Sequence, residues 1–244
     1  MKRWSGLVLL LLALMPAVSA AQRGRLDRLR RVITRDDYVE IGLVGGVNWS
    51  TLTGSDRITA RVSGTGGGFL SVPVAGSLRL RPELSVDNRR VESTRDIIPP
   101  CLPPGPCPPI EERQVATFTW LEAPVLAEWR MDGALGRSLR PRIYGGPFVA
   151  IRLGCSFTTP VEGGGSTSFV VGCGSPDVGN QYHNGDAGFI LGGAIASGGL
   201  GIGARWIRSL VPVAPAGSNP GAGYLLGAKS STLVLTMEFG TRLY

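Results

Sequence analysis

Three groups of residues in this chain have the side chains for chemistry: one histidine, three glutamates and four cysteines. His183 is the only histidine, and Asp186, Ser166 and Ser168 lie near it in the sequence. A serine nucleophile, a histidine base and an orienting acid can transfer or hydrolyse acyl chains. A lone histidine in a long polar segment is more often a solvated side chain. We therefore predict no catalytic residues, and a lipid-modifying enzyme is the least favoured alternative.

Glu83, Glu122 and Glu238 fit general acid and base roles by residue type. Their expected surroundings are rich in arginine, and arginine neighbours hold carboxylates in the ionised form. The composition therefore favours structural ion pairs over acid catalysis.

The four cysteines form two pairs in segments rich in loop residues. Cys101 and Cys107 bracket Leu-Pro-Pro-Gly-Pro, and Cys155 and Cys173 bracket a stretch rich in Gly, Ser and Thr. An exported chain meets oxidising conditions, so among three possible pairings we predict disulfides 101 to 107 and 155 to 173. Metal binding is the alternative, but C-x2-C spacing is lacking and histidine is scarce. We predict neither a metal nor a cofactor.

The N-terminal segment predicts export. Lys2 and Arg3 precede the apolar residues 6–15, which suits a cleaved signal peptide of residues 1–20. The apolar run is shorter than the ~20 residues of a membrane-spanning helix. Residues 21–37, rich in arginine, are interpreted as a basic periplasmic leader, with contact to anionic lipid as the alternative.

The composition argues against nucleic acid as a partner. The formal net charge is +7, but basic residues do not alternate with aromatic ones on a single face. The 36 glycines and 18 prolines suit turns, loops and strands that face a narrow interior.

The elements that carry these residues are predicted to be β-strands, because apolar residues recur at every second position in short segments. The pattern and the turn residues predict eight strands in one domain of residues 38–244. Their expected ranges are 38–49, 67–75, 78–91, 117–131, 141–153, 186–195, 199–209 and 231–243. The connections between them are alternately long and short, beginning with the long segment 50–66 and the tight turn 76–77. Outer-membrane barrels have short periplasmic turns and longer outer loops.

The two faces of these strands differ in polarity. One parity is apolar, with residues such as Leu43, Val125 and Ile202, and almost no charge interrupts it. The other parity has eight cations and seven anions: Glu40, Arg79, Arg81, Glu83, Asp87, Arg89, Glu122, Glu128, Arg130, Arg142, Arg152, Asp186, Arg205, Glu238 and Arg242. This inverts the rule for soluble proteins, in which charges face water. Lipid outside a closed barrel explains it, because a closed wall satisfies every backbone hydrogen bond.

We therefore predict an all-β fold: an eight-stranded antiparallel up-and-down transmembrane β-barrel after a cleaved signal peptide. Eight strands leave an interior that side chains just fill. The nearly balanced charges predict an interior plug of ion pairs instead of an open channel. Inward glycines, including Gly42, Gly192 and Gly201, are expected to make room for the arginine side chains.

Several segments resemble the PorT-like family of outer-membrane β-barrel domains, an eight-stranded barrel of the OmpX/OmpA type. The most specific are Pro-Glu-Leu at 82–84, Leu-Glu-Ala-Pro at 121–124 and Gly-Ala-Arg at 203–205. The similarity spans nearly the whole chain after residue 20, in order. It implies a Gram-negative outer membrane and, for a few relatives, a link to secretion or gliding machinery. This chain ends in Leu243-Tyr244, whereas the family more often ends in one aromatic residue in phase with the outward face.

The sequence thus predicts an outer-membrane scaffold without catalytic activity, whose disulfide-tied loops make contacts outside the cell. The alternative is a narrow transport or secretion-accessory barrel. The expected partners are outer-membrane lipids, the barrel assembly machinery during insertion, and an extracellular or secretion-system protein.

Overall fold

The computed structural model divides the chain into residues Met1–Asp37 and Tyr38–Tyr244. The residues that the structure describes all belong to the second unit, and they are 38–53, 58–97, 110–131, 138–160, 168–172, 182–213 and 227–243. The predictions for the signal peptide, the leader, Cys101, Cys107, Cys173 and Ser166 lie outside the described residues. No helix in the described part is long and apolar enough to cross a membrane.

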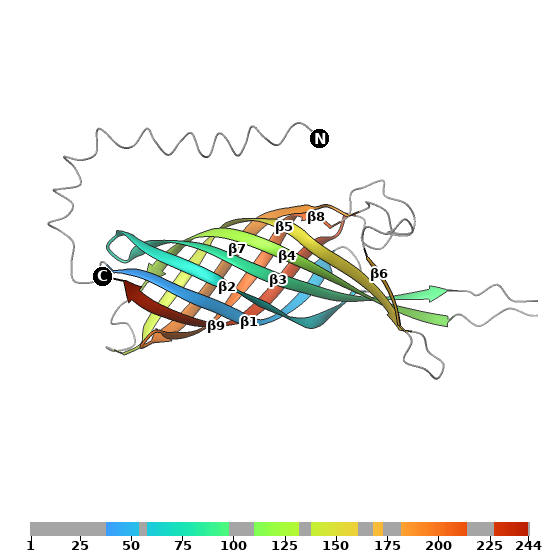
Figure 1. Ribbon diagram of the computed structural model, residues 1–244, viewed down its shortest axis with the longest axis horizontal. Coiled ribbons are helices and arrows are strands. Elements are labelled where there is room, and N and C mark those ends of the chain that lie inside the picture. Colours follow the sequence, from blue (N-terminus) through green and yellow to red (C-terminus); the bar gives the residue numbers. More distant parts are fainter. Residues whose placement is uncertain are drawn as a thin grey trace, which may run out of the picture. The chain divides into compact units, whose positions relative to one another are not determined.

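Nine strands make up the described part of the chain (Figure 1). They are β1 (Val39–Thr53), β2 (Ile58–Ala75), β3 (Leu78–Ile97), β4 (Ile110–Arg130), β5 (Arg140–Pro160), β6 (Ser168–Gly172), β7 (Gly185–Ser197), β8 (Leu200–Pro212) and β9 (Lys229–Leu243).

Eight of these strands close into a barrel. Each pairs with its neighbours antiparallel, and the pairings β1–β9 and β4–β5 complete the ring β1-β2-β3-β4-β5-β7-β8-β9. The short strand β6 is not part of the ring, because it pairs only with the end of β5. The predicted eight-stranded antiparallel barrel is confirmed.

The register of the ring gives the barrel its stagger. Following cross-strand partners from Gly42 of β1 through all eight strands leads back to β1 at Leu52, ten residues further along. A fixed stagger tilts the strands, and eight strands enclose an interior that is filled by side chains.

The two ends of the barrel differ. The first and last strands start and finish at one end, where Val39 pairs with Leu243. This end, here called the turn end, also has the tight turns at Gly76 and at Gly198–Gly199, where positive φ values of 53°, 60° and 96° suit glycine. The opposite end, here called the loop end, carries the connections that follow β1, β3, β5 and β8.

Several strands are longer at the loop end than predicted. The predicted loop 50–66 is wrong, because β2 begins at Ile58 and pairs with β3, with a register irregularity between Ala60 and Thr65. The strands β3, β4 and β5 also extend into predicted loops, and β6 lies within the predicted connection 154–185. The physical reason is that a strand outside the lipid does not need an apolar outer face and a polar inner face. In the extensions of β3, β4 and β5 the sequence therefore loses the period-two signal while the backbone pairing continues, and in β2 the signal is short, from Ile58 to Val62.

The outward and inward faces are as the sequence predicted. Leu43 is 66% exposed and Ile202 is 65% exposed on the outer face, whereas Arg81 and Glu128 are 0% exposed within the barrel. Apolar residues therefore cover the outside of the wall and ionised side chains lie inside it, as a lipid surrounding requires.

Candidate functional site

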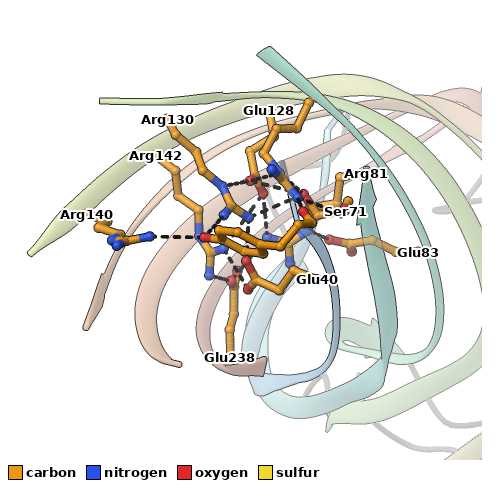
Figure 2. A network of polar contacts seen from close by, with 11 residues as sticks. Glu40, Ser71, Arg81, Glu83, Glu128, Arg130, Arg140, Arg142 and Glu238 are labelled. Carbon is orange, nitrogen blue, oxygen red and sulfur yellow. Dashed lines mark hydrogen bonds and ion pairs between the residues drawn. The ribbon is translucent and has the colours of Figure 1, made fainter. Parts of the chain in front are cut away.

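The polar interior near the turn end holds a dense network of ion pairs and hydrogen bonds, and we call it the lower cluster. Strands from all around the barrel contribute to it, because each strand turns every second side chain inward. Figure 2 shows its guanidinium and carboxylate groups converging. Its members are Tyr38, Glu40, Ser71, Arg79, Arg81, Glu83, Glu128, Arg130, Arg142, Arg205 and Glu238.

Arg81 of β3 lies at the centre of this cluster. Its Nε donates to Glu83 Oε1 at 2.7 Å, and its Nη1 lies 3.2 Å from Glu128 Oε2 and 3.1 Å from Glu238 Oε2. The guanidinium also stacks on Phe69, with its Cζ 4.0 Å from the ring centroid. A guanidinium donates five hydrogen bonds in a planar fork, which lets one arginine join carboxylates from β3, β4 and β9.

Glu128 and Glu40 connect the remaining arginines of the lower cluster. Glu128 Oε1 accepts from Arg130 Nε at 2.6 Å, and Glu128 Oε2 lies 3.8 Å from Arg142 Nη1. Glu40 of β1 binds Arg130 Nη2 at 2.5 Å and Arg142 Nη1 at 3.5 Å. Arg142 also pairs with Glu238. The first and last strands, β1 and β9, are thereby tied to β4 and β5 on the opposite wall.

A second group, the upper cluster, lies nearer the loop end and has one arginine. Arg89 Nε is 3.0 Å from Asp87 Oδ2, its Nη1 is 2.7 Å from Asp186 Oδ2, and its Nη2 pairs with Glu122. Ser209 donates to Asp186 at 2.6 Å, and Asn48 donates to Asp87 at 2.5 Å. Three carboxylates thus share one guanidinium, whereas arginines outnumber carboxylates in the lower cluster. The two clusters therefore carry charge of opposite sign.

Glycine and aromatic residues fit together in the lumen. A Cβ on Gly42 would overlap the Phe69 ring, and one on Gly192 would overlap Tyr144. The predicted role of the inward glycines was space for arginine, and Gly201 does lie beside Arg142. The structure adds that glycines also admit the rings on which the arginines stack, a role that the sequence analysis missed.

An apolar core closes the loop end of the lumen. The rings of Phe118, Phe157 and Tyr182 are packed with centroid distances of 5.2–6.0 Å, and Leu52 and Val91 belong to the same core. This core was not predicted from the sequence, because only the charges of the inward parity were considered. Phe118 and Trp120, which share the parity of Glu122, were the available signal.

Two cavities in the described part of the lumen are small. One of about 40 Å³ lies at the turn end beside Tyr38 and Glu40, and one of about 20 Å³ lies at the loop end beside Arg89 and Trp120. A water molecule needs roughly 10–15 Å³ in this measure, so each cavity holds a few waters at most.

Most of the predicted interior residues are buried within the barrel: Arg79, Arg81, Glu83, Glu122, Glu128, Arg130, Arg142, Asp186, Arg205 and Glu238. Two others lie at its ends. Arg152 is half-buried near the loop end and donates to the amide oxygen of Asn184 at 2.6 Å. Arg242 is exposed at the turn end, with its Cζ 4.4 Å from the Tyr38 ring centroid. Both arginines keep the alternation of the inward-facing residues beyond the ends of the closed wall. The sequence pattern alone therefore placed Arg152 and Arg242 inside the barrel.

The residues considered for chemistry are not assembled into a triad in the described part. His183 is held by its backbone, which donates to the Val213 carbonyl at 3.1 Å. The Asp186 carboxylate is engaged by Arg89 and Ser209. Among the described residues, no group of three or more His, Cys, Asp or Glu side chains could hold a metal ion. Cys155 is disulfide-bonded, and its predicted partner Cys173 lies outside the described residues.

Three solved structures similar to this chain come from different bacteria. Ail, the attachment invasion locus protein of Yersinia pestis, has 9% identity over 83% of this chain and 98% of its own, with a TM-score of 0.37. Neisserial surface protein A has 7% identity over 82% of this chain and 96% of its own, with a TM-score of 0.38. The N-terminal β-barrel domain of Pseudomonas aeruginosa OprF has 11% identity over 83% of this chain and 98% of its own, with a TM-score of 0.31.

The comparison with curated proteins gave no match. The comparison with protein families gave a match over residues 20–213, which include seven of the eight barrel strands. The description of the matched family does not name the PorT-like group, so membership of that group stays a prediction. The chain is therefore an outer-membrane protein, as its closed barrel and apolar exterior indicate, and it belongs to the family described as the outer membrane protein beta-barrel domain.

Proposed function

We propose that this barrel is a non-catalytic scaffold in the outer membrane that presents its loop end for contacts outside the cell. The observation that carries the proposal is the length of the strands. Strands β3 and β4 form a long antiparallel pair, from Leu78 opposite Trp129 to Ile97 opposite Ile110. A tilted strand needs only ~9–11 residues to cross the hydrocarbon. Roughly half of this hairpin therefore projects beyond the membrane.

The neighbouring strands make the projection a sheet instead of a lone hairpin. β2 pairs with β3 as far as Ile58 and Ser93, and β5 pairs with β4 as far as Thr158 and Val115. The strand β6 adds to the outer edge of β5. Ordered strands lower the entropy cost of presenting a fixed surface to a partner.

Disulfides support the same role. Cys155 of β5 is disulfide-bonded and lies opposite Phe118 of β4, at the base of the projecting sheet. The predicted bridges, Cys155 to Cys173 and Cys101 to Cys107, would lower the conformational entropy of the loops that they close. Peptide mapping of the unreduced protein checks both pairings, and a bridge between the two predicted loops would contradict them.

Removing the projection tests the proposal. In the trimmed variant, Asn-Gly replaces residues 92–115, so that the cross-strand partners Val91 and Ala116 flank a two-residue turn. In the control, Asn-Gly replaces Gly198–Gly199 at the turn end. Folding of both is checked by gel migration with and without boiling. Adhesion of intact cells to matrix proteins and to cell monolayers should be lost with trimming and kept in the control. Equal adhesion of the trimmed variant and the wild type would overturn the proposal.

Transport and catalysis remain the competing functions. Planar-bilayer recordings of the purified barrel should show no discrete conductance steps, because buried side chains and small cavities occupy the lumen. Discrete steps would favour the narrow transport alternative. Replacing His183 with Ala should leave the acyl composition of the membrane unchanged, whereas a lipid-modifying enzyme would lose its product.

A further inference from the structure

The outward face of β7, β8 and β9 carries cations at one end and no acid anywhere. At the loop end its outward positions include Arg208 of β8 and Lys229 of β9, both half-buried. All other outward positions of these three strands are apolar or uncharged, and the acidic residues Asp186 and Glu238 face the lumen. This face therefore has a local positive charge at one level of the membrane.

That level is the border of the hydrocarbon. Residues 233–243 of β9 have an apolar outward parity, from Leu233 to Leu243, broken only by Thr241. Their length matches the ~9–11 residues of one crossing. Lys229 and Ser231 lie beyond this stretch, and Arg208 is the cross-strand partner of Ser231. Both cations are thus in the head-group layer of the outer leaflet.

Aromatic rings mark the same border. Phe189 of β7 and Trp206 of β8 pack edge to face, with centroids 5.6 Å apart. Trp206 Nε1 donates to Ser231 Oγ at 2.8 Å, which ties β8 to β9 beneath the cations. Tryptophan is typical of membrane interfaces, where an apolar ring and a polar N–H are both satisfied.

These cations lack the partners that the interior arginines have. Each arginine of the lower and upper clusters has at least one carboxylate within ion-pair distance. Within the described part of the chain, no carboxylate pairs with Arg208 or Lys229. An unpaired cation at a membrane border is stabilised by an anion from the lipid, and long side chains reach the head groups while their stems stay on apolar surface.

We propose that Arg208 and Lys229 form a binding site for a phosphorylated lipid of the outer leaflet. The two cations bind its phosphate groups, Arg208 through two parallel N–H donors. The acyl chains lie against the wall below, along Trp206 and Leu233. Ser231, held by Trp206, adds a polar group opposite Arg208 and two residues from Lys229. The site thus holds the lipid head group on one side of the barrel wall.

The test measures lipid binding by the mature protein in neutral detergent, with native mass spectrometry counting bound molecules. The probe is bis-phosphorylated lipid A, and the same lipid without phosphates is the reference probe. The site variant is R208Q/K229Q, which keeps side-chain length but removes both charges. The matched control is R140Q/R242Q, which removes two arginine charges at the turn end. Gel migration with and without boiling shows that each variant is folded.

Affinity of the wild type for bis-phosphorylated lipid A should exceed that for the dephosphorylated lipid by tenfold or more, as roughly expected for two charge-assisted contacts. The site variant should lose this difference and the control should keep it. An equal loss in both variants would indicate general charge attraction and overturn the proposal. Displacement of the lipid by millimolar inorganic phosphate would also overturn it, because the site would then recognise the free anion.

Discussion

Arg205 Nη1 lies 2.7 Å from Glu83 Oε2, and Glu83 is the only carboxylate within ion-pair distance of Arg205 among the described residues. The other oxygen of Glu83 accepts from Arg81. One buried glutamate therefore neutralises an arginine of β8 that has no second acid, while Arg81 has two more. This asymmetry makes the interior ion pairs unequal in their effect on stability.

Glu83→Gln should destabilise the barrel strongly. The amide leaves Arg205, which is 2% exposed, as a buried charge without a counter-ion. Breaking a buried pair by removing one partner typically costs about 3–5 kcal/mol. Urea unfolding in lipid vesicles, followed by gel migration without boiling, measures the loss. Adding Arg205→Met should restore most of it, because the second variant removes the stranded charge. A double variant as unstable as the single one would contradict this account.

Glu122→Gln should be much milder than Glu83→Gln. Arg89 keeps Asp87 and Asp186 after the change, so no guanidinium is left unpaired. The upper cluster also loses one of three mutually repelling carboxylates. We expect a change of about 1 kcal/mol or less in the same unfolding measurement. A loss equal to that of Glu83→Gln would show that each carboxylate of the cluster is individually required.

The sequence predicted the faces of the strands because lipid and lumen impose opposite polarities on successive residues. Leu80 is 44% exposed and the adjacent Arg81 is fully buried, as their alternation indicated. The strand ends were not predictable in this way. Segment 58–66 has only a short alternation, with apolar Ile58, Ala60 and Val62, before it continues in glycine and threonine, yet its backbone pairs with β1 and β3. Beyond the membrane, pairing depends on the neighbouring strand and not on a pattern within one segment.

Which inward side chains contact each other in the lumen could also not be predicted from the sequence. Arg81 and Glu238 are 157 residues apart in the chain, and they meet only because the ring closes with a fixed register. Parity places both inside but does not say at which level each lies. The same holds for the Phe69 ring, which stacks on Arg81 through space left by Gly42.

Gly42→Ala should destabilise the barrel, whereas Gly66→Ala should not. A Cβ at Gly42 would overlap the Phe69 ring and the Phe239 carbonyl, so the ring that covers Arg81 must move. Overpacking of this kind typically costs about 1–3 kcal/mol. A Cβ at Gly66 would meet nothing within 4 Å, and this glycine has no positive φ. The two variants differ only in position, so equal unfolding midpoints would contradict the proposed role of Gly42.

Leu43→Arg tests where the hydrocarbon lies on the outer wall. Leu43 is 66% exposed, and its cross-strand partner Phe239 is also outward and lies midway along the apolar stretch of β9. An outward arginine at the bilayer midplane costs about 2–4 kcal/mol, and this cost falls to about 0–1 kcal/mol near the interface. Val62, which is 56% exposed and pairs with Trp49 nearer the loop end, provides the matched position. Leu43→Arg should therefore lower the free energy of unfolding in vesicles by at least about 1 kcal/mol more than Val62→Arg, since the depth of the charge is the main difference between them. Equal losses would mean that the lipid does not surround the wall at the level of Leu43.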